Sequence, residues 1–243
     1  MSSSALLKTF GDLRKEVNAM NEQSSTHVQP AETYPSMPQR VVDKEALKQA
    51  QPTRLEPVPR RWSREEYYRM GEAGIFAPDE RVELIEGVIF QMPPQGPVHS
   101  TGTCTTLEAL RIAFGPGFYV RHQLPLSLGL TSDPEPDIAV VPGSFRDYRT
   151  AHPTTALLVV EVSDTTLEFD RHEKASLYAR ADIKDYWIVN IPEQVVEVHR
   201  DPRPDSTEPF QYGYVNVTRH CAGDTITPLA APEAVIQVTD LLP

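Results

Sequence analysis

A central β-strand is predicted for the run Leu157-Leu158-Val159-Val160-Glu161-Val162-Ser163. The run has strand length and is rich in β-branched residues. Because apolar side chains occur at both odd and even positions, we expect this strand to be buried on both faces. Glu161 interrupts the run, and a carboxylate is almost never fully buried unless it is paired or binds a metal ion. Glu161 is therefore a candidate site residue; the alternative is a solvated position at the end of the strand.

A second acid and a lysine belong to the neighbouring elements. Asp137 begins a predicted strand, Pro136-Asp137-Ile138-Ala139-Val140-Val141, and a helix is predicted from about 167 to 181. Lys174 falls on the apolar stripe of that helix by the i, i+3, i+4, i+7 spacing. Its ammonium can point at the carboxylates of the sheet, or its stem can pack while the ammonium stays in water. Two acids on neighbouring strands and an inward lysine suggest a site for a divalent cation.

The remaining elements complete an α/β fold, an α+β mixed sheet with flanking helices. Helices are predicted over 63–73, where Ser63 and Glu66 have the spacing of a capping box, over 99–114 and over 167–181. Strands in one sheet are predicted over 82–92 (two strands joined at Glu86-Gly87), 118–128, 137–141, 157–162 and 186–190. Residues 195–199 should pair with 186–190 as a hairpin. Residues 200–213 are predicted to be a proline-rich excursion, and 214–242 short strands and turns.

Composition limits the partners and the compartment. The chain has 243 residues and a net charge of -11, so any nucleic-acid contact must come from a local patch. The sequence predicts a cytoplasmic protein with no membrane contact. Its two cysteines lack metal-ligand spacing, no secretory apolar core follows Ala5-Leu6-Leu7, and no apolar stretch has transmembrane length.

Residues 1–58 are predicted to lie outside the globular domain, which we place at 59–243. Residues 5–21 have apolar positions at helical spacing and predict an amphipathic helix, either a docking helix for a partner or a weakly ordered tail, because Gly11 interrupts it. Residues 22–58 are polar and contain prolines without periodicity, which predicts a flexible linker.

The order of these pieces resembles the Uma2 family, a domain family of unknown function assigned to the PD-(D/E)xK restriction endonuclease-like superfamily. The matching pieces are Val82-Glu83-Leu84-Ile85-Glu86-Gly87, His99, Pro136-Asp137-Ile138-Ala139-Val140-Val141, Leu158-Val159-Val160-Glu161-Val162-Ser163, Asp170, Lys174, Tyr178 and Tyr186-Trp187-Ile188-Val189. The resemblance covers roughly residues 60–200. It is specific because the acids and the lysine occur together and in this order.

The resemblance implies a restriction endonuclease-like fold and hydrolysis of DNA phosphodiesters with Mg²⁺ or Mn²⁺. It implies that Asp137 and Glu161 are metal ligands and that Lys174 is the catalytic cation. In the usual superfamily motif the lysine lies two residues after the glutamate, where this chain has Ser163, so Lys174 is the substitute that the Uma2-like pattern implies. Asp182-Ile183-Lys184 replaces the usual glycine-containing turn after the helix. Superfamily analogy also suggests a homodimer.

Four further residues of the pattern have less definite roles. Glu83 is a candidate outer metal ligand from the first hairpin, and Glu86 is predicted to be a turn residue. His99 could bind phosphate or tune the site, or else cap a helix or lie at the surface. Tyr178 is predicted to pack in the core.

Three functions remain open from the sequence. The first is a metal-dependent DNA endonuclease, and the second is a catalytically silent nuclease-fold module for protein or nucleic-acid binding, with residues 1–58 as a docking arm. The third is hydrolysis of another phosphate ester. The complete set of two acids and a lysine favours the first function over the second, because a degenerate module would be free to lose it.

Overall fold

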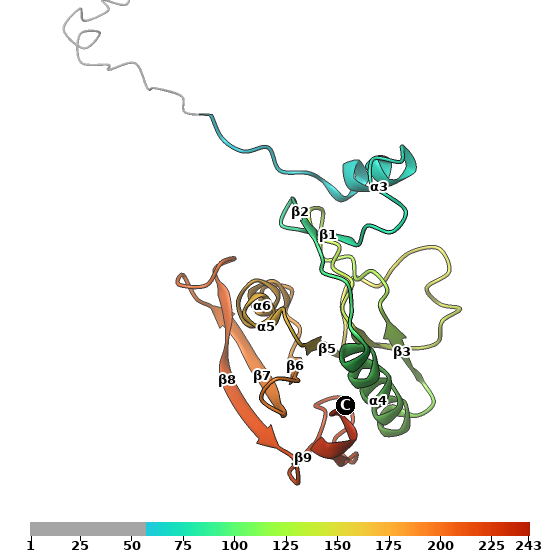
Figure 1. The fold of residues 1–243 in the computed structure, drawn as a ribbon, viewed down its shortest axis with the longest axis vertical. Coiled ribbons are helices and arrows are strands. Elements are labelled where there is room, and N and C mark those ends of the chain that lie inside the picture. Colours follow the sequence, from blue (N-terminus) through green and yellow to red (C-terminus); the bar gives the residue numbers. More distant parts are fainter. Residues whose placement is uncertain (1–56) are drawn as a thin grey trace, which may run out of the picture. The chain divides into compact units, whose positions relative to one another are not determined.

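The computed structural model describes residues 57–243 (Figure 1). The predicted helix over 5–21 and nearly all of the predicted linker over 22–58 lie outside the described residues, so the boundary at 58/59 stays a prediction. Within residues 57–243, no helix combines the length and the apolar character that crossing a lipid bilayer requires.

A six-stranded mixed sheet forms the centre, in the order β3-β4-β5-β6-β7-β8. The strands are β3 (Phe118–His122), β4 (Ile138–Pro142), β5 (Leu158–Ser163), β6 (Asp185–Asn190), β7 (Val195–Pro204) and β8 (Tyr212–Cys221). Only β5 and β6 are parallel; the other neighbours are antiparallel. The prediction of a mixed sheet is confirmed, and β5 is an interior strand that is buried along its whole length.

The two faces of the sheet carry separate apolar cores. Ile138 and Val140 of β4 face a core that includes helix α4 (Pro97–Phe114), together with the short C-terminal elements β9 (Thr225–Ile226), β10 (Ile236–Gln237) and η2 (Val238–Asp240). Ala139 and Val141 face the other core, which includes helix α6 (Ala175–Arg180). Figure 1 shows α4 and α6 on either side of β5. Since side chains alternate along a strand, Asp137 and Glu161 belong to the α6 face.

The first hairpin lies outside this sheet, so its predicted place in the sheet is wrong. Strands β1 (Val82–Ile85) and β2 (Val88–Gln91) form a sheet of their own. The outer edge of β1 makes one isolated bridge, in which the N–H of Asp133 donates to the Leu84 carbonyl at 2.7 Å. Pro134 and Pro136 follow Asp133 and have no N–H, so this pairing cannot extend into a ladder.

Two strand boundaries also differ from the prediction. β3 ends at His122 rather than near 128, because Gln123 has a positive φ of 48° and Pro125 follows. The predicted excursion over 200–213 is instead the paired end of β7 and the start of β8. β6 pairs with β7 only as far as Arg200, so Pro202 and Pro204 fall where β7 has a neighbour on one side only. A missing N–H on the open side costs no ladder hydrogen bond.

The helices follow the sequence more closely. α3 (Arg64–Glu72) begins after Ser63, and its capping box with Glu66 is present as predicted. α4 begins at Pro97, two residues before the predicted start, so His99 lies in its first turn. The predicted helix over 167–181 is divided into α5 (Leu167–Phe169), a π-helical segment η1 (Asp170–Lys174) and α6. Asp170 and Lys174, at the two ends of η1, are both buried.

Candidate active site

Asp137 and Glu161 meet where the pairing of β4 with β5 ends. The main-chain N–H of Asp137 donates to Glu161 Oε2 at 3.0 Å, and the N–H of Val162 donates to Asp137 Oδ2 at 2.9 Å. Each carboxylate therefore accepts a main-chain hydrogen bond from the opposite strand, which fixes both groups relative to the sheet. Glu161 is only 5% exposed, so the alternative of a solvated strand end does not hold.

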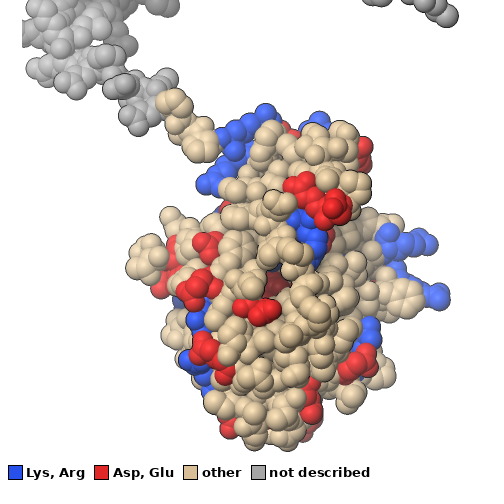
Figure 2. All heavy atoms as spheres, viewed as in Figure 1, with Lys and Arg blue, Asp and Glu red and all other residues tan. Residues whose placement is uncertain are grey.

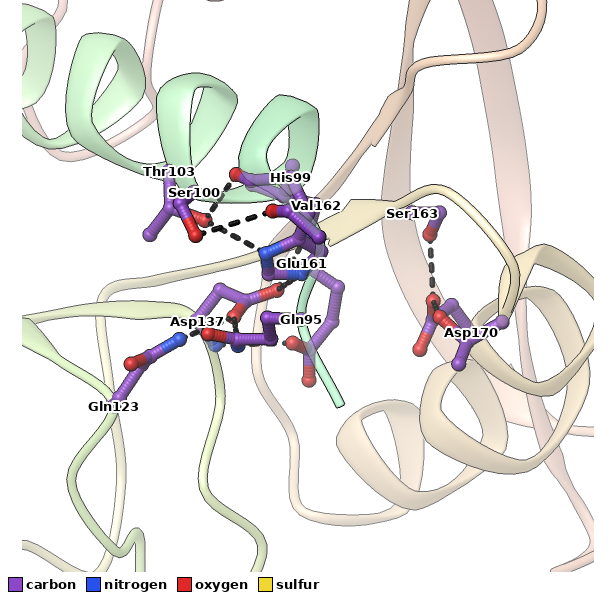
Figure 3. Close-up of polar contacts among 12 residues, drawn as sticks. Gln95, His99, Ser100, Thr103, Gln123, Asp137, Glu161, Val162, Ser163 and Asp170 are labelled. Carbon is purple, nitrogen blue, oxygen red and sulfur yellow. Dashed lines mark hydrogen bonds and ion pairs between the residues drawn. The ribbon is translucent and has the colours of Figure 1, made fainter. Parts of the chain in front are cut away.

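Three side chains from separate elements surround Asp137 (Figure 3). Gln95 Nε2 and Gln123 Nε2 donate to Oδ1 at 3.2 and 3.1 Å, and His99 Nε2 lies 3.2 Å from Oδ2. Burial opposes the charged form of both Asp137 and His99, but their mutual contact outweighs it. The pKa of Asp137 is lowered, and that of His99 is raised. His99 is thus neither a helix cap nor a surface residue; it is a partner of the first acid.

Lys174 reaches the site from η1 and bridges two acids. Its Nζ donates to Glu83 Oε2 at 2.5 Å and to Glu161 Oε1 at 3.2 Å, and the residue is 1% exposed. The alternative of an ammonium in water is therefore wrong, and Glu83 enters the site as the partner of the lysine. Burial opposes the charge of Lys174, but Glu161 and Glu83 raise its pKa. At Glu161, burial outweighs the attraction of Lys174 and raises the pKa of that carboxyl to about 8.

Tyr178 and Asp170 complete the arrangement on the helical side. The Tyr178 hydroxyl donates to Glu161 Oε1 at 2.7 Å, so this residue does more than pack in the core. Asp170 accepts hydrogen bonds from Ser163 Oγ at 2.5 Å and Thr166 Oγ1 at 2.7 Å, and burial raises its pKa to about 6. Both residues lie four positions from Lys174, on the same helical face, and this spacing could have indicated their place in the site. Gln95 and Gln123 lie in connecting segments without such a signal.

A cavity of about 70 Å³ opens onto these groups. Its lining is strongly charged and includes Arg81, Glu83, His99, Glu135, Asp137, Glu161, Asp164, Asp170 and Lys174. Figure 2 shows a hollow near the middle of this face, with acidic atoms in and beside it. A phosphate ester could approach the two acids and the lysine from this opening.

The donor set fits a hydrated divalent cation better than a cation enclosed by protein ligands. Among residues 57–243, no group of three or more His, Cys, Asp or Glu is arranged to hold a metal ion. Mg²⁺ commonly takes one or two carboxylates and keeps several waters, which suits Asp137 and Glu161 beside an open cavity. Each carboxylate oxygen has two acceptor positions. All four of Asp137 are engaged by Gln95, Gln123, His99 and the Val162 N–H, so an ion bound there replaces one of these donors.

The mixed sheet, with one acid on β5, another directly before β4 and a lysine from the following helical segment, defines a restriction endonuclease-like α/β protein. The chain belongs to the Uma2 family, described as "Putative restriction endonuclease", whose model matches residues 64–238. The fold is similar to a crystal structure of "a putative nuclease belonging to DUF820" from Anabaena variabilis. The two share 18% identity with a TM-score of 0.54, over 76% of this chain and 97% of that chain. No curated protein matches the sequence. The predicted family and fold class are confirmed, and the family supports a nuclease role.

Proposed function

We propose that the protein is an endonuclease that hydrolyses DNA phosphodiester bonds with Mg²⁺ or Mn²⁺. The observation that carries this proposal is the convergence of Asp137, Glu161 and Lys174 in one buried hydrogen-bonded set beside an open cavity. Buried ionisable groups that perturb one another beside a cleft are typical of functional sites. Family membership supports the same reaction class.

Asp137 and Glu161 would hold the cation, since both supply the oxygen ligands that Mg²⁺ prefers. When bound, a divalent cation neutralises charge on the phosphate and lowers the pKa of a coordinated water. His99 holds Asp137 in its ionised form, and Tyr178 orients Glu161. These contacts place both carboxylates before the substrate arrives.

Lys174 would act through its charge and not as a base. Its raised pKa keeps the ammonium protonated, and Glu83 fixes its position. In the reaction, a bond forms between a water oxygen and phosphorus while the bond from phosphorus to one sugar oxygen breaks. One proton leaves the attacking water, and the leaving oxygen gains a proton. The ammonium is suited to stabilise the negative charge that gathers on the phosphoryl oxygens meanwhile.

The test compares Asp137→Asn, Glu161→Gln and Lys174→Ala in plasmid nicking and in Mn²⁺ titration. We expect both acid variants to lose metal binding, because each removes a carboxylate ligand. Lys174→Ala should keep metal binding and lower the nicking rate on the order of 10²-fold, the usual cost of losing one electrostatic stabiliser. Lys184→Ala, which removes an exposed lysine paired with Asp182, is the matched control and should nick normally.

Two outcomes contradict the proposal. If the parent nicks no DNA with Mg²⁺ or Mn²⁺, or all three variants nick like the parent, the silent binding module becomes the better function. If the parent hydrolyses small phosphate esters but no DNA, the third function replaces the first. Circular dichroism of each variant separates loss of activity from loss of fold. The homodimer and the cytoplasmic location inferred from the sequence stay predictions.

A further inference from the structure

An aromatic–arginine cluster lies at the end of β4 opposite Asp137. We use this name for Tyr119, Arg121, Phe145, Arg146, Tyr148 and Arg149. The Tyr119 ring contacts Tyr148 in a stacked arrangement and Phe145 edge-on, with ring centroids 6.4 and 6.3 Å apart. Phe145 is 64% exposed, and Arg146 lies over its ring at 5.6 Å. A large apolar ring thus projects into solvent with a cation above it.

The cluster has positive charge that its surroundings do not neutralise. Most lysines and arginines in residues 57–243 form ion pairs with a carboxylate. Arg121, Arg146 and Arg149 form none with the described residues, although the chain carries a net charge of -11. Asp147, in the same loop, accepts the Ser144 main-chain N–H at 2.7 Å and closes the turn. In an acidic chain, a local excess of arginine is the feature that attracts phosphates.

Contacts of the buried Arg121 and of Tyr148 hold the cluster in place. Arg121 is 2% exposed and lies over the rings of Tyr119 and Tyr148, at 5.8 and 5.6 Å. Its guanidinium donates to the Pro125 carbonyl at 2.9 Å, while its buried Nε has no hydrogen-bond partner among the described residues. The Tyr148 hydroxyl donates to the Pro142 carbonyl at 2.8 Å. The exposed ring of Phe145 therefore rests on an ordered base of tyrosines and a buried cation.

The position of the cluster relates it to the acids. Asp137 and Val141 lie on the same face of the β4 segment, and Val141 pairs with Tyr119. Four strand residues span about 13 Å, a distance that a few nucleotides of a single strand can bridge. Figure 2 shows basic atoms projecting at the right, where Figure 1 draws the loop between β4 and β5, in the same view as the hollow.

We propose that the aromatic–arginine cluster binds single-stranded DNA, with Phe145 stacking on an unpaired base and Arg146 and Arg149 contacting the adjacent phosphates. Stacking on exposed aromatic rings combined with arginine contacts to the backbone is the usual mode of single-strand recognition. That the bound base lies a few nucleotides from the scissile bond rests on the proposed nuclease function. The binding itself does not.

The test measures anisotropy of a fluorescein-labelled oligothymidine with the full chain in EDTA. Phe145→Ala should weaken binding about five-fold or more, and a duplex of equal length should be affected less, because its bases are already stacked. Arg146→Ala/Arg149→Ala should lower the slope of log K against log salt by about 1.4, which is two single-strand phosphate contacts. The control Arg111→Ala/Ile112→Ala removes an exposed arginine and an exposed apolar side chain from α4, and should bind like the parent.

Three results would each overturn the proposal. The parent binds no single strand, the cluster variants bind it like the parent, or the control variant loses as much affinity for it as the cluster variants do. An equal loss for duplex and single strand overturns the stacking role of Phe145. Hydrolysis of bis(p-nitrophenyl) phosphate with Mn²⁺ separates this proposal from the nuclease function, because this small diester needs only the acids and Lys174. The cluster variants should hydrolyse it like the parent. If the parent neither hydrolyses it nor nicks plasmid, the nuclease proposal fails, while the oligothymidine measurements still show whether the cluster binds a single strand.

Discussion

Individual hydrogen bonds decide the ionisation of the site residues. Glu161 is buried among acids, and within residues 57–243 its charged form is stabilised by hydrogen bonds from Lys174, Tyr178 and the Asp137 N–H. Asp137 is equally enclosed, yet its pKa is lowered because more donors surround it, His99 among them. Two carboxylates on adjacent strands therefore differ in how readily they give up a proton. Burial opposes ionisation of both carboxyl groups, and the donors around each of them account for the difference.

Tyr178→Phe tests the hydroxyl that holds Glu161. The change removes one hydrogen bond and keeps the ring, so we expect a loss of about 1 kcal/mol in the free energy of unfolding. We also expect weaker Mn²⁺ binding, because the ionised form of Glu161 loses a donor. Tyr214→Phe is the matched control, since its hydroxyl donates to the Ile183 carbonyl away from the site. Urea unfolding and Mn²⁺ titration of both variants check this; equal metal affinities in the two would contradict it.

The sequence predicted the site residues that lie on regular elements. Asp137, Glu161 and Lys174 were indicated by strand and helix periodicity, because each element fixes the direction of its side chains. The places of Gln95 and Gln123 in the site could not be predicted, since both residues lie in connecting segments whose path depends on the folded chain. Gln123, for example, has a positive φ, which nothing in its side chain signals.

Among the elements, η1 contributes most to the site. A regular α-helix turns 100° per residue, and the wider turn of a π-helix accommodates one additional residue. Asp170 and Lys174 stand at its two ends, with Asp170 facing Ser163 and Lys174 facing Glu83. One short segment thus presents an acid and a cation to the same cavity.

Deletion of His172 should convert η1 to a regular helical turn. His172 has an exposed side chain, so we expect the variant to fold with little change in melting temperature. The deletion leaves Asp170 three positions before Lys174 instead of four, so the two side chains lose the spacing that the wide turn gives them. Plasmid nicking should fall to background, whereas His172→Ala, which keeps the length, should nick normally. A deletion variant as active as His172→Ala would show that the site does not need the π-helical turn.

The elements that the sequence failed to place depend on contacts across long separations. Alternation of apolar residues predicted β1 and β2 as strands, but not that prolines after Asp133 would exclude them from the central sheet. Pro202 and Pro204 predict an excursion, because the sequence does not show that at these positions β7 has a neighbouring strand on one side only. The local sequence pattern thus identifies which segments are strands, whereas which strands pair with each other depends on contacts in the folded sheet.

Across the whole molecule, an ion-pair network joins the helical side to the far strands. Arg171 of η1 donates to Glu197 of β7 at 3.0 and 2.5 Å and to Glu193 at 3.1 Å, and Arg219 of β8 pairs with Glu193. Burial opposes ionisation of Glu197, but His199 at 3.8 Å and the hydrogen bonds from Arg171 and Asn190 lower its pKa. The network connects segments that are distant in sequence.

Acid should weaken the fold through Glu197. Its folded pKa lies below the ordinary value of 4.5, so the unfolded chain binds the proton more readily. The stabilisation is therefore complete above pH 4.5 and is lost as the pH falls toward the folded pKa. Glu197→Gln should be less stable than the parent by roughly 2 kcal/mol at pH 7, and the gap should narrow below pH 4.5. Urea unfolding across pH checks this against Glu72→Gln, an exposed control; a constant gap would contradict it.

The reciprocal hydrogen bonds between β4 and β5 have an evolutionary consequence. Asp137 and Glu161 each accept a main-chain N–H of the opposite strand, so replacing either acid with an apolar residue leaves a buried donor without an acceptor. A descendant that had abandoned chemistry would still be selected to keep both acids in order to fold, so, contrary to the expectation from the sequence, a silent module would not be free to lose them. Retention of the pair within the family would therefore record two selective pressures, one for reaction and one for the closing of the sheet.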